Sequence, residues 1–188
     1  VREGKVRYIG TSNDTAYGLT KANETSKNKN LARFESIQNN FSLLNPRFLD
    51  ELSTVCKKEN ISLLPYSPIG GGVLSGKYNN AFYPEDARFS AYMKHENPRV
   101  QAQATRFVND KTIAATIKYL ELAREYGISP VTLAVAYSKH FDFVASTIIG
   151  ARTSEQLDES LKAFNFAIDN ELLSKIELIQ KEILYPMG

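Results

Sequence analysis

The sequence contains little of the chemistry that metal and thiol sites use: one cysteine, two histidines and no tryptophan among 188 residues. A single cysteine excludes an internal disulfide. Cys56 lies in a helical apolar pattern, which predicts a buried thiol in a protein from a reducing compartment. His95 and His140 lack metal-ligand spacing to cysteine, aspartate or glutamate, so no metal site is predicted.

Strong charge imbalance and long apolar runs are also absent. The net charge is +2 and no basic, aromatic-rich cluster occurs, so we expect no nucleic acid as a partner. No apolar run reaches the roughly 18 residues of a membrane helix, and no signal peptide is recognisable, so we expect a cytoplasmic protein without a membrane partner. Motifs of the type G-x-S-x-G, G-x-G-x-x-G and Walker A are missing, which disfavours hydrolase, Rossmann and P-loop chemistry.

Four short segments, most of them apolar, are typical of buried strands: residues 6–10, 35–39, 61–66 and 143–150. Each is followed by turn residues and a helical pattern, which predicts βα units and a parallel sheet in one α/β domain over residues 1–188. The helix after the last strand is expected to bury Leu157, Leu161 and Phe164. Residues 78–110 are expected to form a long, irregular and functional loop, whose aromatic residues either line a substrate site or pack the loop in place.

Polar residues follow each expected strand. Because ligands bind at the carboxyl ends of parallel strands, these groups form a candidate site. Amide and hydroxyl side chains suit a neutral polar group such as a carboxamide, whereas an arginine beside a helix N-terminus suits a phosphate. The residues concerned are Ser12, Asn13, Gln38, Asn39, the loop that begins at Tyr66, and Gly150 to Arg152.

The loop YSPIGGGVLSGK (residues 66–77) carries the strongest pattern. Its glycines let backbone N–H groups approach a ligand closely, and clustered N–H groups bind phosphate. Ser67 and Ser75 add hydroxyl donors, Lys77 adds a positive charge, and Tyr66 offers a ring for stacking. An incidental flexible loop is the alternative.

Structural roles are open for the other candidates as well. Ser12 and Asn13 form an N-cap signature, and Gln38 has the chemistry to satisfy a backbone group. Arg152 fits an exposed surface position, and Gln156 has the spacing to close a capping box.

Four motifs in this order resemble the aldo-keto reductase superfamily. GKVRYIGTSN (residues 4–13) is similar to its fifth strand and IQNNFSLL (37–44) to its sixth. LPYSPIGGGVLSGKY (64–78) is similar to its seventh and TIIGARTSEQL (147–157) to its eighth. The nearest group is that of bacterial and plant oxidoreductases related to channel β-subunits. The resemblance implies a (β/α)8 barrel of the TIM type, of which this chain carries only the C-terminal four βα units, a half-barrel.

The family binds NADPH in an extended form and reduces aldehyde and ketone carbonyls. The resemblance therefore implies that Ser12, Asn13 and Gln38 bind the carboxamide and that Tyr66 stacks on the nicotinamide ring. It places Ser67, Ile69, Gly70 and Lys77 at the pyrophosphate, with backbone amides as the main donors. It places Gly150, Arg152, Gln156, Glu159 and Ser160 at the adenosine end, with Arg152 favouring the 2′-phosphate of NADP. Ala151 and Ser160 depart from the usual serine and asparagine.

The family's catalytic Asp, Tyr, Lys and His come from the first four strands, and no motif here matches them. Lys5, Tyr8, Tyr17 and His95 do not substitute for them, so no catalytic residue is assigned. Because a half-barrel exposes two strand edges, we expect the chain to pair with an N-terminal half or with a second copy, or to be the ordered remnant of a longer polypeptide. A non-catalytic nucleotide-binding module and a general phosphate binder are the rival hypotheses.

Overall fold

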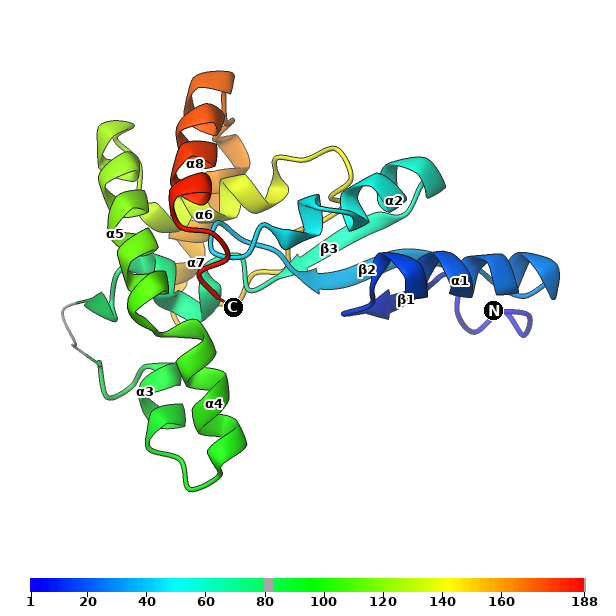
Figure 1. Ribbon diagram of the computed structural model, residues 1–188, viewed down its shortest axis with the longest axis horizontal. Coiled ribbons are helices and arrows are strands. Elements are labelled where there is room, and N and C mark those ends of the chain that lie inside the picture. Colours follow the sequence, from blue (N-terminus) through cyan, green and yellow to red (C-terminus); the bar gives the residue numbers. More distant parts are fainter. Residues whose placement is uncertain (80–82, 188) are drawn as a thin grey trace.

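The computed structural model describes residues 1–79 and 83–187 (Figure 1). Its sheet has three parallel strands in the order β1 (Ile9–Ser12), β2 (Phe34–Asn40) and β3 (Ser62–Tyr66). Helix α1 (Ala16–Asn28) connects the first two strands. A 3₁₀ helix (Arg47–Leu49) and helix α2 (Leu52–Glu59) connect the second two. The predicted parallel α/β architecture is confirmed, although the first strand begins three residues later than expected.

The prediction of a fourth strand at residues 143–150 is wrong. The segment runs along the outer edge of β3 but makes only one isolated bridge, between Leu63 and Val144. Ala145 N donates to Leu63 O at 3.0 Å, and Ile148 N donates to Pro65 O at 2.8 Å. Three residue steps in the segment therefore span two in β3, so the register slips and no regular ladder forms.

The remaining helices are α3 (Arg88–Met93), α4 (Pro98–Phe107), α5 (Asp110–Glu125), α6 (Pro130–Lys139), α7 (Ser154–Leu161) and α8 (Asn170–Glu182). Their caps follow from the sequence. Asn109 and Thr112 form a capping box on α5, Ser129 caps α6 before Pro130, and the Asp169 carboxylate accepts from Leu172 N at 2.8 Å. No helix in the described ranges is long and apolar enough to cross a membrane.

The expected buried stripe of α7 is wrong. Leu157, Leu161 and Phe164 are 40, 51 and 81% exposed, whereas Ser160 and Ala163 on the opposite side are buried. The helix packs against α6 through this second face. The apolar stripe of Leu157, Leu161 and Phe164 therefore packs against no other element within the described part of the chain.

The segment at 78–110 also differs from the expected irregular loop, because it contains α3 and α4, which pack together below the rest of the molecule in Figure 1. Its aromatic residues fix it in place: the Phe89 and Phe107 rings stack with centroids 4.9 Å apart. The Tyr78 hydroxyl accepts from Phe89 N at 3.2 Å. Asn97 followed by Pro98, an N-cap with proline in the first turn, was the unused sequence signal for α4.

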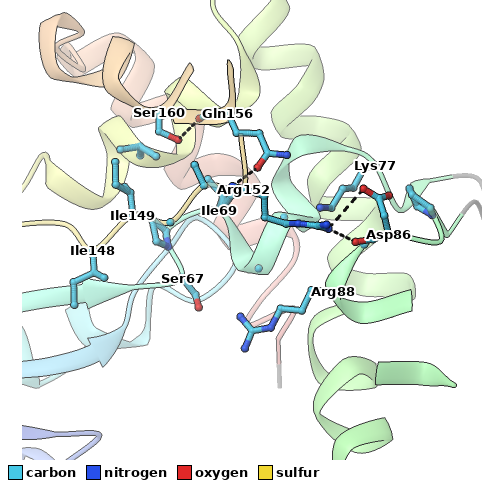
Figure 2. Close-up of a pocket in the computed structure, with 18 residues that line it drawn as sticks. Ser67, Ile69, Lys77, Asp86, Arg88, Ile148, Ile149, Arg152, Gln156 and Ser160 are labelled. Carbon is cyan, nitrogen blue, oxygen red and sulfur yellow. Dashed lines mark hydrogen bonds and ion pairs between the residues drawn. The ribbon is translucent and has the colours of Figure 1, made fainter. Parts of the chain in front are cut away.

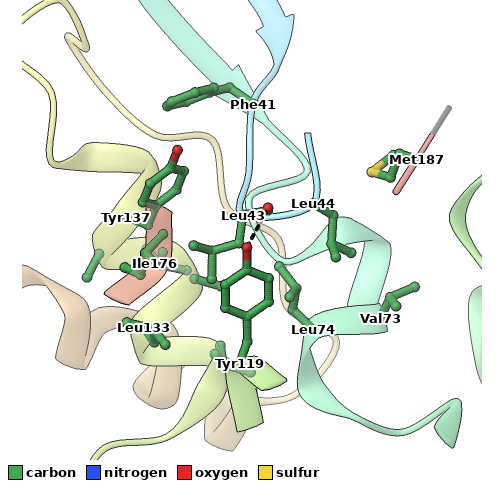
Figure 3. Close-up of a cluster of buried hydrophobic side chains, with 14 of the residues drawn as sticks. Phe41, Leu43, Leu44, Val73, Leu74, Tyr119, Leu133, Tyr137, Ile176 and Met187 are labelled. Atoms are coloured by element: carbon green, nitrogen blue, oxygen red, sulfur yellow. Dashed lines mark hydrogen bonds between the residues drawn. The ribbon is translucent and has the colours of Figure 1, made fainter. Parts of the chain in front are cut away.

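A large part of the buried core lies beyond the carboxyl end of the sheet (Figure 3). There Leu43 and Leu44, which follow β2, meet Leu74 of the 3₁₀ helix Gly70–Ser75 and residues of α5, α6 and α8. The buried Tyr119 hydroxyl of α5 donates to Leu43 O at 3.1 Å. This packing holds in place the loops that follow β2 and β3, where the candidate site lies.

One face of the sheet is built from small and polar residues. Register places Gly10, Ser36 and Ser62 in one row and Ser12, Gln38 and Leu64 in the next. A Cβ on Gly10 would lie 2.4 Å from Ser36 Oγ and 3.0 Å from the backbone Ser36 O, so a side chain there would require Ser36 and its strand to shift. These six residues are exposed or half-buried, so this face is open to solvent in the described structure.

Candidate functional site

A cavity of about 650 Å³ opens beside the glycine-rich loop (Figure 2). The loop forms one wall, residues 84–88 form the second, and residues 148–160 form the third. Its size falls within the range of about 300–1,000 Å³ that small-molecule sites occupy. The predicted site residues that line it are Ser67, Ile69, Lys77, Gly150, Arg152, Gln156 and Ser160.

Side chains, more than backbone amides, give the cavity its charge. Three amides of the glycine loop already donate within the loop: Gly70 N to Ser67 O, Gly72 N to Ile69 O, and Gly76 N to Val73 O, at 2.8–3.0 Å. Lys77, Arg88 and Arg152 line the cavity together with a single carboxylate, that of Asp86. The cavity is therefore electropositive, which suits an anionic ligand.

Lys77 is held against the glycine loop. Gly72 has φ +99°, which favours glycine, and a Cβ there would lie 2.7 Å from Lys77 Cε, so a side chain at this position would displace the end of the lysine. Partial burial lowers the pKa of the Lys77 ammonium, the Asp86 charge opposes this shift, and the Arg152 charge adds to it. A bound anion would stabilise the charged ammonium.

Arg152 is fixed at both its backbone and its side chain. The Gln156 side chain accepts from Arg152 N at 2.9 Å, while Thr153 caps α7. The guanidinium of Arg152 contacts the carbonyl of Asp86, and its Nη1 lies 3.6 Å from the Asp86 carboxylate (Figure 2). Gln156 thus orients the turn that presents the arginine, and the expected capping-box bond to the cap residue is replaced by one to Arg152.

The second group of predicted residues forms a hydrogen-bonded cluster at the strand ends. The Ser12 hydroxyl donates to Gln38 O at 3.0 Å, and the Tyr66 hydroxyl donates to Asn13 Oδ1 at 2.8 Å. Asn13 N donates to Gln38 O at 3.0 Å. Helix α1 is capped by Thr15, which accepts from Gly18 N, so Ser12 and Asn13 are not its N-cap.

The cavity and this polar cluster are adjacent, because Tyr66 belongs to the cluster and the next residue, Ser67, lines the cavity. Ser67 has φ +54°, a left-handed conformation in which the chain leaves β3. Gly70 is buried and is not among the residues that line the cavity. Glu159 is not among the lining residues, and its carbonyl accepts from the Thr132 hydroxyl at 3.1 Å. Ser160 is buried, and its hydroxyl donates to Gln156 O at 3.0 Å.

Two polar residues of the site were not predicted from the sequence: Asp86 and Arg88 reach the cavity from the segment that carries α3. Asn39, expected among the strand-end residues, contacts Asn13 in the polar cluster. The cluster of charged residues in EDAR (residues 85–88) was the only sequence signal for Asp86 and Arg88, and an exposed turn explains that pattern equally well.

Comparison with known proteins connects this geometry to one family. The model of the Aldo/keto reductase family matches residues 1–181. Protein tas of Escherichia coli K12 is 35% identical over 185 residues, which cover 98% of this chain and 51% of that protein. L-glyceraldehyde 3-phosphate reductase of the same organism is 27% identical, with 88% of this chain and 46% of that protein covered.

A putative voltage-gated potassium channel subunit beta of Schizosaccharomyces pombe is 28% identical, with 95% of this chain and 52% of that protein covered. The chain thus spans about half the length of the curated relatives that it matches. The match to the family model runs through both the polar cluster and the cavity walls. The chain belongs to the aldo/keto reductase family.

Proposed function

We propose that this chain is the cofactor-binding part of an NADPH-dependent reductase of aldehyde and ketone carbonyls. The observation that carries the proposal is the continuity between an electropositive cavity and a cluster of amide, hydroxyl and phenol groups. An extended dinucleotide needs both, because its phosphates are anionic and its carboxamide is neutral and polar.

The residues present fit the anionic end of such a cofactor. In this proposal Lys77 binds the pyrophosphate, and Arg152 and Arg88 bind the 2′-phosphate of the adenosine moiety. Ile69 and Ile149 supply apolar cavity wall for the base. Gln156 and Ser160 hold the turn that carries Arg152. Three cations against one carboxylate leave a positive balance, which a phosphorylated ligand neutralises.

The strand-end cluster fits the nicotinamide end. Tyr66 would stack on the ring and thereby leave one face accessible, while Ser12, Asn13 and Gln38 would bind the carboxamide. NADPH, when bound, supplies the hydride that the carbonyl carbon accepts. The chain's own residues hold and orient this donor. We propose no proton donor from this chain, because none of its tyrosines or lysines matches the family's catalytic motifs.

We further propose that the strands form half of a (β/α)8 barrel that is completed by an N-terminal half or by a second copy. The two edges of the sheet are incompletely paired in the described structure: β1 pairs only with β2, and residues 143–148 make three backbone hydrogen bonds along β3 without forming a regular ladder. Tyr8, which directly precedes β1, is 72% exposed. A partner that pairs with β1 would bury this ring and supply the proton donor.

Cofactor binding tests the proposal directly. Isothermal titration of the chain with NADPH and with NADH should give tighter binding of NADPH. Arg152→Gln should remove most of this preference, while Lys162→Gln, at an exposed lysine that follows the C-terminal end of α7, serves as the charge-matched control. Binding of sugar phosphates with no binding of either cofactor would overturn the proposal in favour of a general phosphate binder.

Assembly is tested separately. Size-exclusion chromatography with mass measurement should show self-association or aggregation, and co-expression with an N-terminal half from a family member should shift the chain into a one-to-one complex. A cooperative, well-behaved monomer would contradict the half-barrel proposal.

A non-catalytic nucleotide-binding module is the second candidate function, supported by the similarity to the putative channel subunit beta. Carbonyl reduction by the assembled barrel distinguishes the two. Turnover of NADPH with an aldehyde favours the reductase, and tight NADPH binding without turnover favours the module. Burial of the lone Cys56 fits the cytoplasmic location that we propose in either case.

A further inference from the structure

Asn39 makes an unusual contact at the carboxyl end of β2. Its side-chain Oδ1 accepts from the backbone N–H of Asn13 at 2.8 Å. The same N–H also donates to Gln38 O at 3.0 Å, so two acceptors from adjacent residues share one donor. Asn39 pairs in register with Pro65, whose nitrogen has no hydrogen to donate. The Asn39 side chain therefore contacts the residue that follows β1, while the Asn39 backbone lies opposite a proline of β3.

The residue that Asn39 holds is conformationally demanding. Asn13 has φ +53°, in the left-handed region that costs energy for residues other than glycine, although asparagine tolerates it best. Such a conformation persists when surrounding contacts specify it. Fixing the Asn13 backbone also fixes its side chain, whose Oδ1 accepts from the Tyr66 hydroxyl at 2.8 Å.

These contacts form a chain from Asn39 through Asn13 to Tyr66. We propose that Asn39 is a positioning residue, which orients the Tyr66 ring and the Asn13 amide for the nicotinamide end of the cofactor. This inference rests on the proposed function and extends it to a residue that contacts neither the cavity nor the ring. This role requires a hydrogen-bond acceptor at the Oδ1 position of residue 39, but no hydrogen-bond donor from its side chain.

The experiment measures the affinity of three variants for two ligands. Asn39→Leu removes the acceptor at similar size, Asn39→Asp keeps an acceptor oxygen, and Asn40→Leu removes the next amide of the same strand, which contacts Asn45 instead of Asn13. Each is titrated with NADPH and with 2′-phospho-ADP-ribose, which has the adenosine end but no nicotinamide. Losing one of two acceptors on a backbone N–H should weaken NADPH binding by about three- to tenfold.

The expected result is specific to one end of the ligand. Asn39→Leu weakens NADPH binding and leaves 2′-phospho-ADP-ribose binding unchanged, Asn39→Asp restores NADPH affinity to within about twofold, and Asn40→Leu changes neither. In a Tyr66→Phe background, where the hydroxyl contact is missing, the effect of Asn39→Leu should shrink.

Several results would overturn the inference. An equal loss for both ligands would show a general structural role, and unchanged NADPH affinity in Asn39→Leu would show no role. If Asn40→Leu weakened NADPH binding as much as Asn39→Leu does, the effect would not be specific to Asn39. If the wild-type chain binds 2′-phospho-ADP-ribose or sugar phosphates but not NADPH, the proposed function itself fails, which is a distinct outcome.

Discussion

The contact between Arg152 and Asp86 predicts that an acidic residue of the cavity competes with the ligand. Asp86 is the one carboxylate among the lining residues, and it lies 3.6 Å from the Arg152 guanidinium. An anion that binds Arg152 must displace or share this partner. Asp86→Asn should therefore strengthen the binding of NADPH while preserving the size of the side chain.

The magnitude follows from geometry and exposure. Two unit charges about 3.6 Å apart in water attract by about 1 kcal/mol, and exposed pairs are worth about 0.2–1 kcal/mol. The side chains of Arg152 and Asp86 are 69% and 81% exposed, so the low dielectric constant of a protein interior does not strengthen their attraction. The contact of Arg152 with the Asp86 carbonyl is unchanged in the variant, which limits the release of the arginine. We expect a gain of about two- to fivefold in affinity.

Isothermal titration at pH 7.5 measures the effect. The gain should decrease in 0.5 M salt, because exposed charges are screened. Glu85→Gln is the matched control, since Glu85 is adjacent but does not line the cavity. Weaker binding in Asp86→Asn, or an undiminished gain in the Arg152→Gln background, would refute the reasoning.

Three further predictions concern stability and reactivity. Burial raises the pKa of Tyr119 in the folded chain. Its contribution to the free energy of unfolding is therefore fully present below the unfolded tyrosine pKa of about 10 and decreases as the pH rises above it. Unfolding followed by circular dichroism and tyrosinate formation followed by absorbance should occur together in that pH range. Burial raises the pKa of the Cys56 thiol to about 11, so a disulfide reagent at pH 8 should react roughly a hundredfold faster after unfolding; equal rates would contradict a buried thiol. Gly71→Ala should cost about 2–4 kcal/mol in thermal unfolding, because its Cβ would lie 2.6 Å from the Phe89 ring at φ +63°, whereas Gly127→Ala, at φ +64° with open space, should cost only the backbone part of about 1 kcal/mol.

The outline of the fold was predictable because it rests on local signals. Caps such as Asp169 and Ser129 fix helix starts through one side chain and the next few backbone N–H groups, so they can be read from neighbouring residues. Short apolar runs bounded by turns located β1 to β3 for the same reason. The prediction for residues 143–150 was wrong as a strand because a ladder depends on the register with β3, which an apolar run does not encode.

The candidate site divides in the same way. Ser12, Asn13, Gln38 and Tyr66 follow their strands directly, so the parallel order alone brings them to one end of the sheet. Asp86 and Arg88 lie in a segment whose position depends on the packing of Phe89 against Phe107, and no spacing in the sequence encodes that contact.

The sequence by itself thus determined the βα order, most of the helix caps and the identity of the residues at the strand ends, since these depend on interactions within a few residues. Only the tertiary structure decided how those residues are used. It placed Ser12 and Asn13, which do not cap α1, in a cluster with Gln38 and Tyr66. It also engaged amides of the glycine loop internally and left the cavity's positive charge to side chains from three separate segments. Such choices depend on which groups compete for the same donor or space, and that competition exists only once distant segments have come together.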